Sequence, residues 1–324
     1  LRRSFWTTNQ TMKTETSTVL VIGFGSIGQR HVRILREMGQ KVHVFSRRKL
    51  QEEEYYQNLE AALNEVHPEY VVIANETSEH ESTLKTALSF GIPKILVEKP
   101  LFLTSVENLP ENPKSQVCVA YNLRFHSRLQ HLFSEIKEQS IISVQVYVGQ
   151  YLPHWRPQQD YRKSYSVSRA QGGGVLRDLS HELDYINWLF GPWQAISALG
   201  GHYSSLAGDS DDVFCLLLKM ENCPAVVLQL NYLDRTGRRE ILINTDQHTY
   251  RLDLMKQEFS RDQEHVSSYS LEKDETYRNQ HTDMLNNNGK LCCSLQEGLD
   301  VLRMIDAAEK SAETETWQKN QHLR

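Results

Sequence analysis

The stretch TVLVIGFGSIGQRHVRILREMG, residues 18–39, decides the fold. A run of aliphatic residues ends at Ile22, a glycine-rich turn follows, and the segment after the turn has the composition of a helix. A strand, a turn of the form G-x-G-x-x-G and a helix, in this order, is the context in which the pattern binds a dinucleotide. The glycine turn lets the pyrophosphate approach the backbone closely, and the helix N-terminus supplies amides that hydrogen-bond to it. The residues that we expect to hold the pyrophosphate are Gly23, Gly25, Ser26, Ile27 and Gly28.

Strands and helices continue to alternate after this unit. Short β-branched runs occur in KVHVFSRR, YVVIANET, KILVEKP and QVCVAYN, and each is continuous rather than alternating, as in strands buried on both faces. We therefore predict an α/β fold whose N-terminal Rossmann domain, residues 17–122, is a doubly wound parallel sheet.

Beyond residue 122 the strand-like runs follow one another with few helices between them. This pattern predicts a C-terminal α+β domain, residues 123–324, with a large, mostly antiparallel open sheet. We expect this domain to bind substrate and to form the contacts of a homo-oligomer, a homodimer or a homotetramer. Two of the runs, DDVFCLLLKM and CPAVVLQLNYL, are more apolar than half-solvated strands should be, which indicates a covered outer face. The run SLQEGLDVLRMIDAAEKSAE predicts a final amphipathic helix.

Composition narrows the class of protein. A net charge of −5 gives no support to nucleic-acid binding, and no apolar run is long enough for a transmembrane helix. Five scattered cysteines without metal-ligand spacing favour reduced thiols in the cytoplasm and no metal site. Residues 1–16 have no apolar core, so we expect a flexible N-terminal extension rather than a secretory signal, with Met12 as a natural start.

The end of the second strand bears on the choice of dinucleotide. NAD sites usually place an acid there, whereas this chain has Phe45-Ser46-Arg47-Arg48-Lys49 and no acid before Glu52. Ser46 and Arg47 could hold a 2′-phosphate by charge-assisted hydrogen bonds. The sequence therefore favours NADP over NAD, while solvated loop arginines remain the alternative.

A second set of polar residues lies after the strand ending in KILVEKP and in the stretch GGGVLRDLSHELDYINWLFG, residues 172–191. Pro100 ends the strand, so Lys99 is expected to point into the crevice beyond the strand ends. On a helical wheel of about 100° per residue, His181 lies opposite an apolar face and between Asp178 and Asp184. The residues of that face are Val175, Leu176, Leu179, Leu183, Ile186 and Phe190.

A long segment, residues 151–174, precedes this helix with no clear secondary structure and reads as a functional lid. Arginines and aromatic residues cluster in it and just before it. Such side chains suit a substrate that bears carboxylate or phosphate, although a solvated basic loop is an equal alternative. The candidate substrate ligands here are Arg124, Trp155, Arg156, Tyr161 and Arg162, and the segment also holds Tyr165 and Arg169.

Together these motifs resemble the Gfo/Idh/MocA oxidoreductases, the glucose–fructose oxidoreductase and inositol dehydrogenase group. The resemblance runs from about residue 17 to residue 315. It is carried by the glycine turn, Asn75 with His80, Glu98-Lys99-Pro100, Tyr121-Asn122, and the three glycines followed by Asp178 and His181.

The resemblance implies reversible hydride transfer between a nicotinamide and a hydroxyl or keto carbon of a sugar, an inositol-like polyol or a nucleotide sugar. In that reading Lys99 touches the substrate hydroxyl and the nicotinamide, His181 is the acid or base, and Asp178 orients the substrate. Asn75, His80, Glu98 and Asn122 would contact the cofactor, and Tyr121 the substrate. The gap from the aspartate to the histidine is three residues where the family usually has four, so Asp184 or Tyr185 could take part of the role of Asp178. A carboxylate beside the imidazole would raise its pKa above about 6.5.

Three other interpretations remain open at this point. The chain could be an oxidoreductase that never releases its dinucleotide, a non-catalytic dinucleotide-sensing regulator of the same fold, or a purely structural partner. The specific sugar, the carbon that reacts and the direction of reaction do not follow from the sequence.

Overall fold

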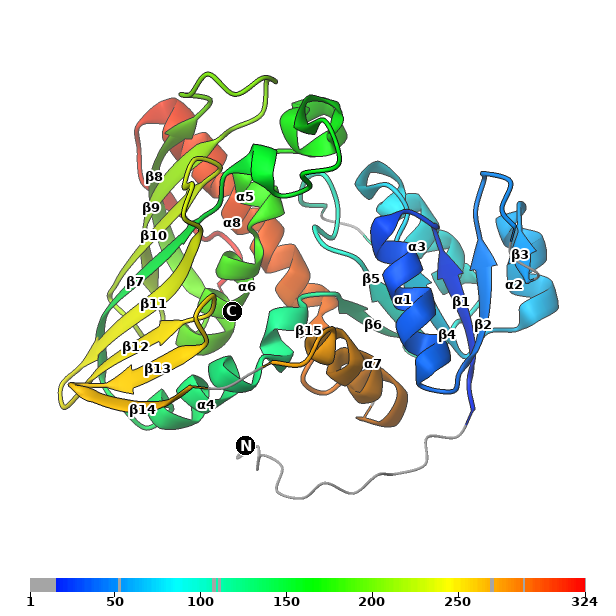
Figure 1. The fold of residues 1–324 in the computed structure, drawn as a ribbon, viewed down its shortest axis with the longest axis horizontal. Coiled ribbons are helices and arrows are strands. Elements are labelled where there is room, and N and C mark those ends of the chain that lie inside the picture. Colours follow the sequence, from blue (N-terminus) through cyan, green and yellow to red (C-terminus); the bar gives the residue numbers. More distant parts are fainter. Residues whose placement is uncertain are drawn as a thin grey trace.

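A computed structural model of the chain describes residues 16–51, 54–106, 109, 112–268, 271–287 and 289–323. The expected N-terminal extension, apart from residue 16, lies outside the described residues. Two lobes stand side by side, each built on its own sheet (Figure 1).

The first lobe is the predicted parallel sheet. Six strands run parallel in the order β6-β5-β4-β1-β2-β3. Residues 70–73 have no exposed surface, which explains their continuous apolar sequence. The elements are β1 (Thr18–Ile22), α1 (Ser26–Glu37), β2 (Lys41–Phe45), β3 (Tyr55–Tyr56), α2 (Leu59–Val66), β4 (Tyr70–Ile73), the 3-10 turn η1 (Thr77–Glu79), α3 (His80–Ser89), β5 (Lys94–Val97) and β6 (Gln116–Val119).

The second lobe carries a nine-stranded sheet in the order β14-β13-β12-β11-β7-β10-β9-β8-β16. Neighbouring strands are antiparallel except β7 and β10, which run parallel. The mostly antiparallel sheet expected from the sequence is confirmed. Its strands are β7 (Ile141–Gly149), β8 (Trp193–Gly201), β9 (Val213–Met220), β10 (Ala225–Asn231), β11 (Arg238–Thr245), β12 (Thr249–Asp253), β13 (Glu258–Arg261), β14 (Glu264–Ser268) and β16 (Gln318–Lys319).

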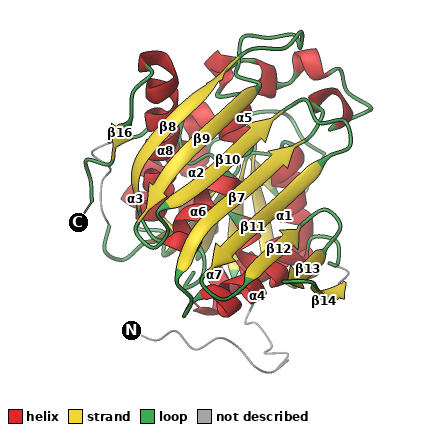
Figure 2. Cartoon of the chain, turned by 90° about the vertical axis from the view of Figure 1, so that its left-hand side faces the viewer, coloured by secondary structure: helices red, strands yellow, loops and turns green. Residues whose placement is uncertain are grey.

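Helices cover only one face of this large sheet. In Figure 2 the other face is turned to the viewer, and no helix of the described chain crosses it. Along β9 and β10 buried and exposed side chains alternate, so the inner face forms the core. The helices on that side are α5 (Val175–Asp178), α6 (His181–Phe190) and α8 (Leu295–Thr314), and α4 (Ser127–Ile136) packs against β12 near the edge of the sheet.

The chain returns to the first lobe after the second sheet is complete. Helix α7 (Glu275–Asn287) packs on α1, and the short strand β15 (Cys293–Ser294) pairs antiparallel with β6. Helix α8 then crosses back to β8. The domain boundary between residues 122 and 123 stays a prediction. Within residues 275–294, α7 packs on the first lobe and β15 adds a strand to its sheet.

Candidate active site

The glycine turn leaves the start of α1 open. Gly23 has φ = 102°, and a Cβ on it would lie 2.4 Å from the carbonyl oxygen of Ala74. A Cβ on Gly25, in contrast, would meet no atom within 4 Å. No side chain caps the first amides of α1. Free amides, a helix N-terminus and an open approach at Gly25 fit a dinucleotide pyrophosphate.

Asn75 and His80 lie beside this turn, after β4. The Asn75 side-chain nitrogen donates to Thr83 Oγ1 at 2.9 Å, and the side-chain oxygen Oδ1 is buried with no hydrogen-bond partner in the described part of the chain. That oxygen is free for a bound group. His80 is buried, and its nitrogens lie 3.1–3.2 Å from the backbone oxygens of Asn75, Pro100 and Leu101. Burial lowers the pKa of His80, and the ring lies between these two segments of backbone.

Ser46 and Arg47 are less free than the sequence implied. Ser46 is buried and accepts a hydrogen bond from the Arg48 amide at 3.1 Å. Arg47 is exposed and forms ion pairs with Glu76 and Glu79. These acids come from the turn after β4, not from the end of β2, so counting residues along the second strand could not reveal them. Glu52 lies outside the described residues.

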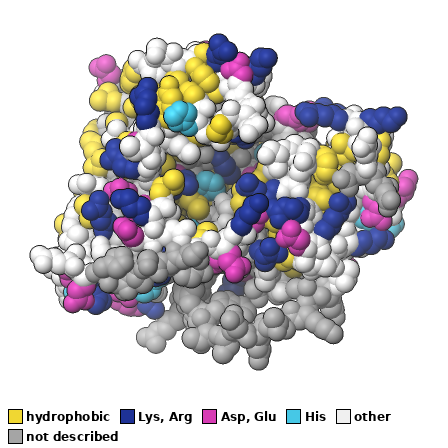
Figure 3. All heavy atoms as spheres, viewed as in Figure 1, with side chains coloured by type: hydrophobic (Ala, Val, Ile, Leu, Met, Phe, Trp, Pro, Cys, Tyr) yellow, Lys and Arg dark blue, Asp and Glu magenta, His cyan; other side chains and the backbone are white. Residues whose placement is uncertain are grey.

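Lys99 joins the two lobes. It follows β5, and its Nζ donates to the carbonyl oxygen of Asp178, 2.7 Å away in α5. Its backbone amide donates to Glu98 Oε2 at 3.0 Å, and the Glu98 side chain is buried. The strand end of the first lobe thus reaches the predicted catalytic segment of the second. The space-filling view shows the surface hollowed between the lobes (Figure 3).

The predicted catalytic helix is interrupted. Helix α5 ends at Asp178, a two-residue turn follows, and His181 begins α6. Despite the break, the apolar face is confirmed. Its residues are all buried: Val175, Leu176, Leu179, Leu183, Ile186 and Phe190.

The carboxylate of Asp178 is engaged by two tyrosines. Its two carboxylate oxygens accept hydrogen bonds from the hydroxyls of Tyr165 and Tyr232, both at 2.7 Å. Asp184 is paired with Arg124 instead of His181, and Tyr185 is fully buried. The expectation that Asp178 or Asp184 supports the imidazole is therefore wrong. The tyrosines that hold Asp178 come from the preceding loop and from the segment after β10, a juxtaposition that no local spacing encodes.

His181 is left with positive neighbours. Its ring lies edge-on to Tyr121, with centroids 5.6 Å apart, and its Nδ1 is buried without a hydrogen-bond partner among the described residues. Burial lowers the pKa of His181 well below 6.5, and the charges of Lys99 and Arg239 lower it further. The expected rise in this pKa is corrected to a fall, because both aspartates that were to raise it are engaged elsewhere.

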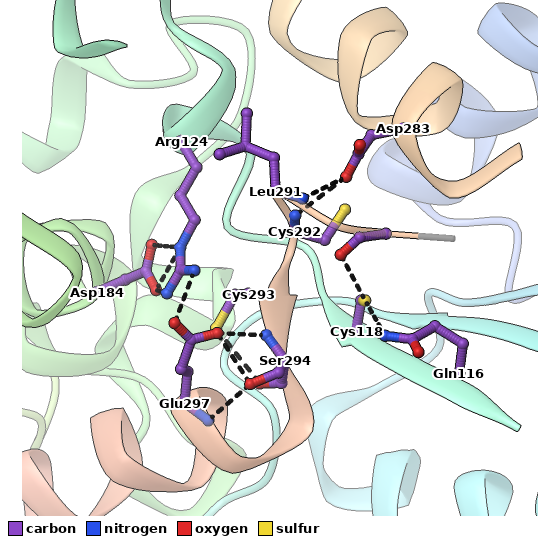
Figure 4. Close-up of polar contacts among 11 residues, drawn as sticks. Gln116, Cys118, Arg124, Asp184, Asp283, Leu291, Cys292, Cys293, Ser294 and Glu297 are labelled. Atoms are coloured by element: carbon purple, nitrogen blue, oxygen red, sulfur yellow. Dashed lines mark hydrogen bonds and ion pairs between the residues drawn. The ribbon is translucent and has the colours of Figure 1, made fainter. Parts of the chain in front are cut away.

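Arg124 also departs from its expected role. It is buried, forms three hydrogen bonds of 2.7–3.2 Å to Asp184, and reaches Glu297 Oε1 at 3.1 Å (Figure 4). Glu297 in turn forms a capping box with Ser294 at the start of α8. Arg124 thus ties α6 to α8 and is not a free cation for substrate. Asn122 nearby is buried and donates to Thr276 Oγ1 at 2.8 Å.

The lid segment folds as four short 3-10 turns, η3 (Leu152–His154), η4 (Tyr161–Lys163), η5 (Tyr165–Val167) and η6 (Arg169–Gln171). Its residues line an open cavity of about 480 Å³. Trp155, Arg156 and Tyr161 are among the residues that line it, and Tyr165 connects its wall to Asp178. Arg162 is held by Asp160 in a two-pronged ion pair.

Among the described residues, no helix is long and apolar enough to cross a membrane. No group of three or more potential metal ligands is found in the same part of the chain.

Comparison with known families gives two matches. Residues 17–115 match the model of an oxidoreductase family with an NAD-binding Rossmann fold, GFO_IDH_MocA. Residues 135–266 match the GFO/IDH/MocA C-terminal domain.

Individual proteins are similar to the chain as well. An oxidoreductase of Synechocystis sp. is 28% identical over 204 residues, which are 57% of this chain and 54%, about half, of that protein. A levoglucosan dehydrogenase solved with NADH aligns over 95% of this chain and 100% of its own, with a TM-score of 0.81 and 16% identity. The WlbA dehydrogenase of Bordetella pertussis, solved with NADH and UDP-GlcNAcA, aligns over the same shares with a TM-score of 0.74 and 16% identity.

Proposed function

This chain belongs to the Gfo/Idh/MocA oxidoreductase family, an NAD-binding family, and from that premise we propose that it is an NAD(P)-dependent dehydrogenase or reductase acting on CH–OH groups. We propose as substrate a sugar, an inositol-like polyol or a sugar nucleotide. The observation that carries the proposal is the meeting of Lys99 with the segment that bears His181, across the two lobes. The solved dehydrogenases of similar fold, with levoglucosan or UDP-GlcNAcA in their names or complexes, support the substrate class.

The roles of the site residues follow from their surroundings. A bound nicotinamide supplies hydride exchange with carbon, so the protein has to handle a proton on oxygen. The His181 ring accepts that proton when an alcohol is oxidised, because the lowered pKa keeps the ring neutral. When substrate binds, the Lys99 ammonium gives up its hydrogen bond to the Asp178 carbonyl oxygen and donates to the substrate oxygen instead. Asp178 itself accepts hydrogen bonds from Tyr165, at the wall of the lid cavity, and from Tyr232.

For the cofactor we propose the glycine turn, Ser26, Ile27 and Asn75 as contacts, with Glu98 and Asn122 holding the segments next to it. We propose NADP as the preferred dinucleotide, bound through Ser46 and Arg47. Glu76 and Glu79 limit this preference, because Arg47 must exchange at least one ion pair for a 2′-phosphate. NAD, which brings no such phosphate, leaves those pairs intact.

We propose a cytoplasmic setting, in which the five cysteines, all free thiols, would stay reduced. The lid cavity is proposed to take the part of the substrate beyond the reacting carbon, with Arg156 as its cation and Trp155 and Tyr161 as its aromatic walls.

The test is oxidation of NADPH and NADH by the purified protein in the presence of keto-sugars and sugar nucleotides, repeated with Lys99→Met. We expect turnover by the wild type and a loss of about 10²–10⁴ in the variant, with dinucleotide affinity retained. Dinucleotide binding without turnover on any substrate would favour the regulator. Equal turnover in Lys99→Met would remove Lys99 from the mechanism.

A further inference from the structure

Four side chains form a continuous buried hydrogen-bonded chain beneath the site. Glu98 Oε1 lies 2.8 Å from His31 Nε2, His31 Nδ1 lies 2.9 Å from His281 Nε2, and His281 Nδ1 lies 2.9 Å from the Tyr70 hydroxyl. His31, His281 and Tyr70 have no exposed surface. They come from α1, α7 and β4, and the mechanism proposed above uses none of these three.

The donors and acceptors in this chain can be assigned. As a carboxylate, Glu98 only accepts, so His31 donates through Nε2. If His31 is neutral, its Nδ1 accepts from the Nε2–H of His281, whose Nδ1 then accepts the Tyr70 hydroxyl proton. Burial lowers the pKa of His281 well below 6.5 and raises that of Tyr70, which keeps both in the required forms.

The opposite arrangement is less complete. A cationic His31 would donate to both neighbours, and His281 would then donate to the Tyr70 oxygen. The buried Tyr70 hydroxyl proton would be left without an acceptor in the described part of the chain. An unmet buried donor costs about 1–3 kcal/mol, so the neutral arrangement is favoured.

The series of hydrogen bonds ends at Glu98, which is next to Lys99 of the candidate active site. The second oxygen of Glu98 accepts the backbone amide of Lys99, and Lys99 Nζ reaches the Asp178 carbonyl. We propose that His31, His281 and Tyr70 are positioning residues that fix Glu98 and, through it, the backbone from which Lys99 addresses the substrate. The catalytic part of this inference rests on the proposed function, whereas the orientation of Lys99 does not.

The arrangement also explains why α7 returns to the first lobe. His281 lies on α7, and His31 of α1 connects it to Glu98, the residue that follows β5. The segment that follows the second sheet therefore supports the strand end of the first. An error of about 1 Å in such a reacting group can cost on the order of 10²-fold in rate.

The first experiment measures the protonation and tautomer of the two histidines directly. Imidazole ¹⁵N spectra at pH 7 should show His31 and His281 as neutral rings protonated at Nε2. Tyr70→Phe should move the His281 Nδ1 resonance toward that of a free acceptor. The matched control is Tyr147→Phe, which removes a tyrosine hydroxyl bonded to Asp234 at 2.9 Å in the other lobe, and should leave both histidines unchanged. A cationic His31, or Nδ1–H tautomers, would overturn the assignment.

The second experiment separates positioning from packing. His31→Gln can still donate to Glu98, whereas His31→Asn is too short. We expect the ¹³C-dimethyl signal of reductively methylated Lys99, assigned with Lys99→Met, to shift in His31→Asn and to stay near its wild-type position in His31→Gln. Equal shifts in the two variants, or none in either, would overturn the proposed positioning role.

Turnover supplies the catalytic arm. On a substrate found active with the wild type, His31→Asn should lower kcat by about 10²-fold, His31→Gln by less than about 10-fold, and neither should change the Kd of the dinucleotide by more than about threefold. Unchanged kcat in His31→Asn would overturn the catalytic consequence. Absence of turnover in the wild type would refute the proposed function, while the Lys99 signal would still decide the positioning role.

Discussion

At the scale of single residues, His181 shows how surroundings set a proton acceptor. The carboxylates of Asp178, Glu182 and Asp184 bind tyrosines or arginines, and the charges that reach the ring are positive. A base so placed is neutral over most of the pH range, but it binds a proton weakly. Lys99, which lowers its pKa, would also stabilise a developing alkoxide, so the two groups share the work.

We predict a pH profile that follows from this direction. Because His181 acts deprotonated and its pKa lies below 6.5, the rate of alcohol oxidation should fall only below pH 6.5. His181→Asn should lower kcat by about 10²–10⁴ and abolish this acidic limb, while thermal unfolding stays near the wild type. An acidic limb above pH 6.5 in the wild type would contradict the arrangement described above.

A second prediction at this scale concerns Arg47. Glu79→Gln removes one of its partners and should raise the affinity for NADP relative to NAD, whereas Arg47→Ala should weaken NADP by about 10–100-fold and leave NAD nearly unchanged. Calorimetric titration at matched ionic strength measures both. Arg48→Ala is the control, since Arg48 is a neighbouring exposed arginine. A tighter complex with NAD than with NADP in the wild type would refute the proposed preference.

At the scale of elements, Arg124 decides how α6 sits on α8. The Arg124–Asp184 pair is buried on both sides, so removing one partner leaves an uncompensated charge. We predict that Arg124→Met lowers the free energy of unfolding by about 3–5 kcal/mol in urea. The control is Arg162→Met, which breaks the exposed pair with Asp160 and should cost less than about 1 kcal/mol. A higher KM with unchanged stability would instead return Arg124 to the substrate site.

Some elements and contacts can be predicted from the local sequence, and others cannot. Strand, turn and helix at residues 18–39 are encoded locally, and so is the apolar face below His181. The positions of Asp178 and Arg124 are not, because Tyr232, one of the two partners of Asp178, lies 54 residues away along the chain, and Asp184 lies 60 residues from Arg124. The acids beside Arg47 follow a different strand from the one that carries it. A sequence pattern marks the charged residues near a site, but it does not show which of them the fold engages with other side chains.

At the scale of the whole molecule, buried histidines link stability to pH. Burial lowers the pKa of His80, His126, His181 and His281, that of His126 to about 4. In the unfolded chain these residues bind protons near pH 6.5, so below that pH the unfolded state binds more protons than the folded one. We predict that the urea concentration at the unfolding midpoint is lower at pH 5 than at pH 7. A higher midpoint at pH 5 would contradict this.

The uncovered face of the large sheet carries the last prediction. On it Leu199 pairs with Cys215 across β8 and β9, and Leu217 pairs with Val227 across β9 and β10. Leu199 is 67% exposed and Leu217 is 50% exposed. Positions that face water in an antiparallel strand usually carry polar side chains instead. Such an apolar patch favours burial against a second copy of the chain, so we propose a homodimer or homotetramer. Light scattering should report it at micromolar concentration. Leu217→Lys should shift it toward monomer without lowering the unfolding midpoint by more than a few degrees, whereas Phe90→Lys, at an exposed apolar position on the other lobe, should not. A wild-type monomer would refute the interface, and the apolar strands would then need another partner.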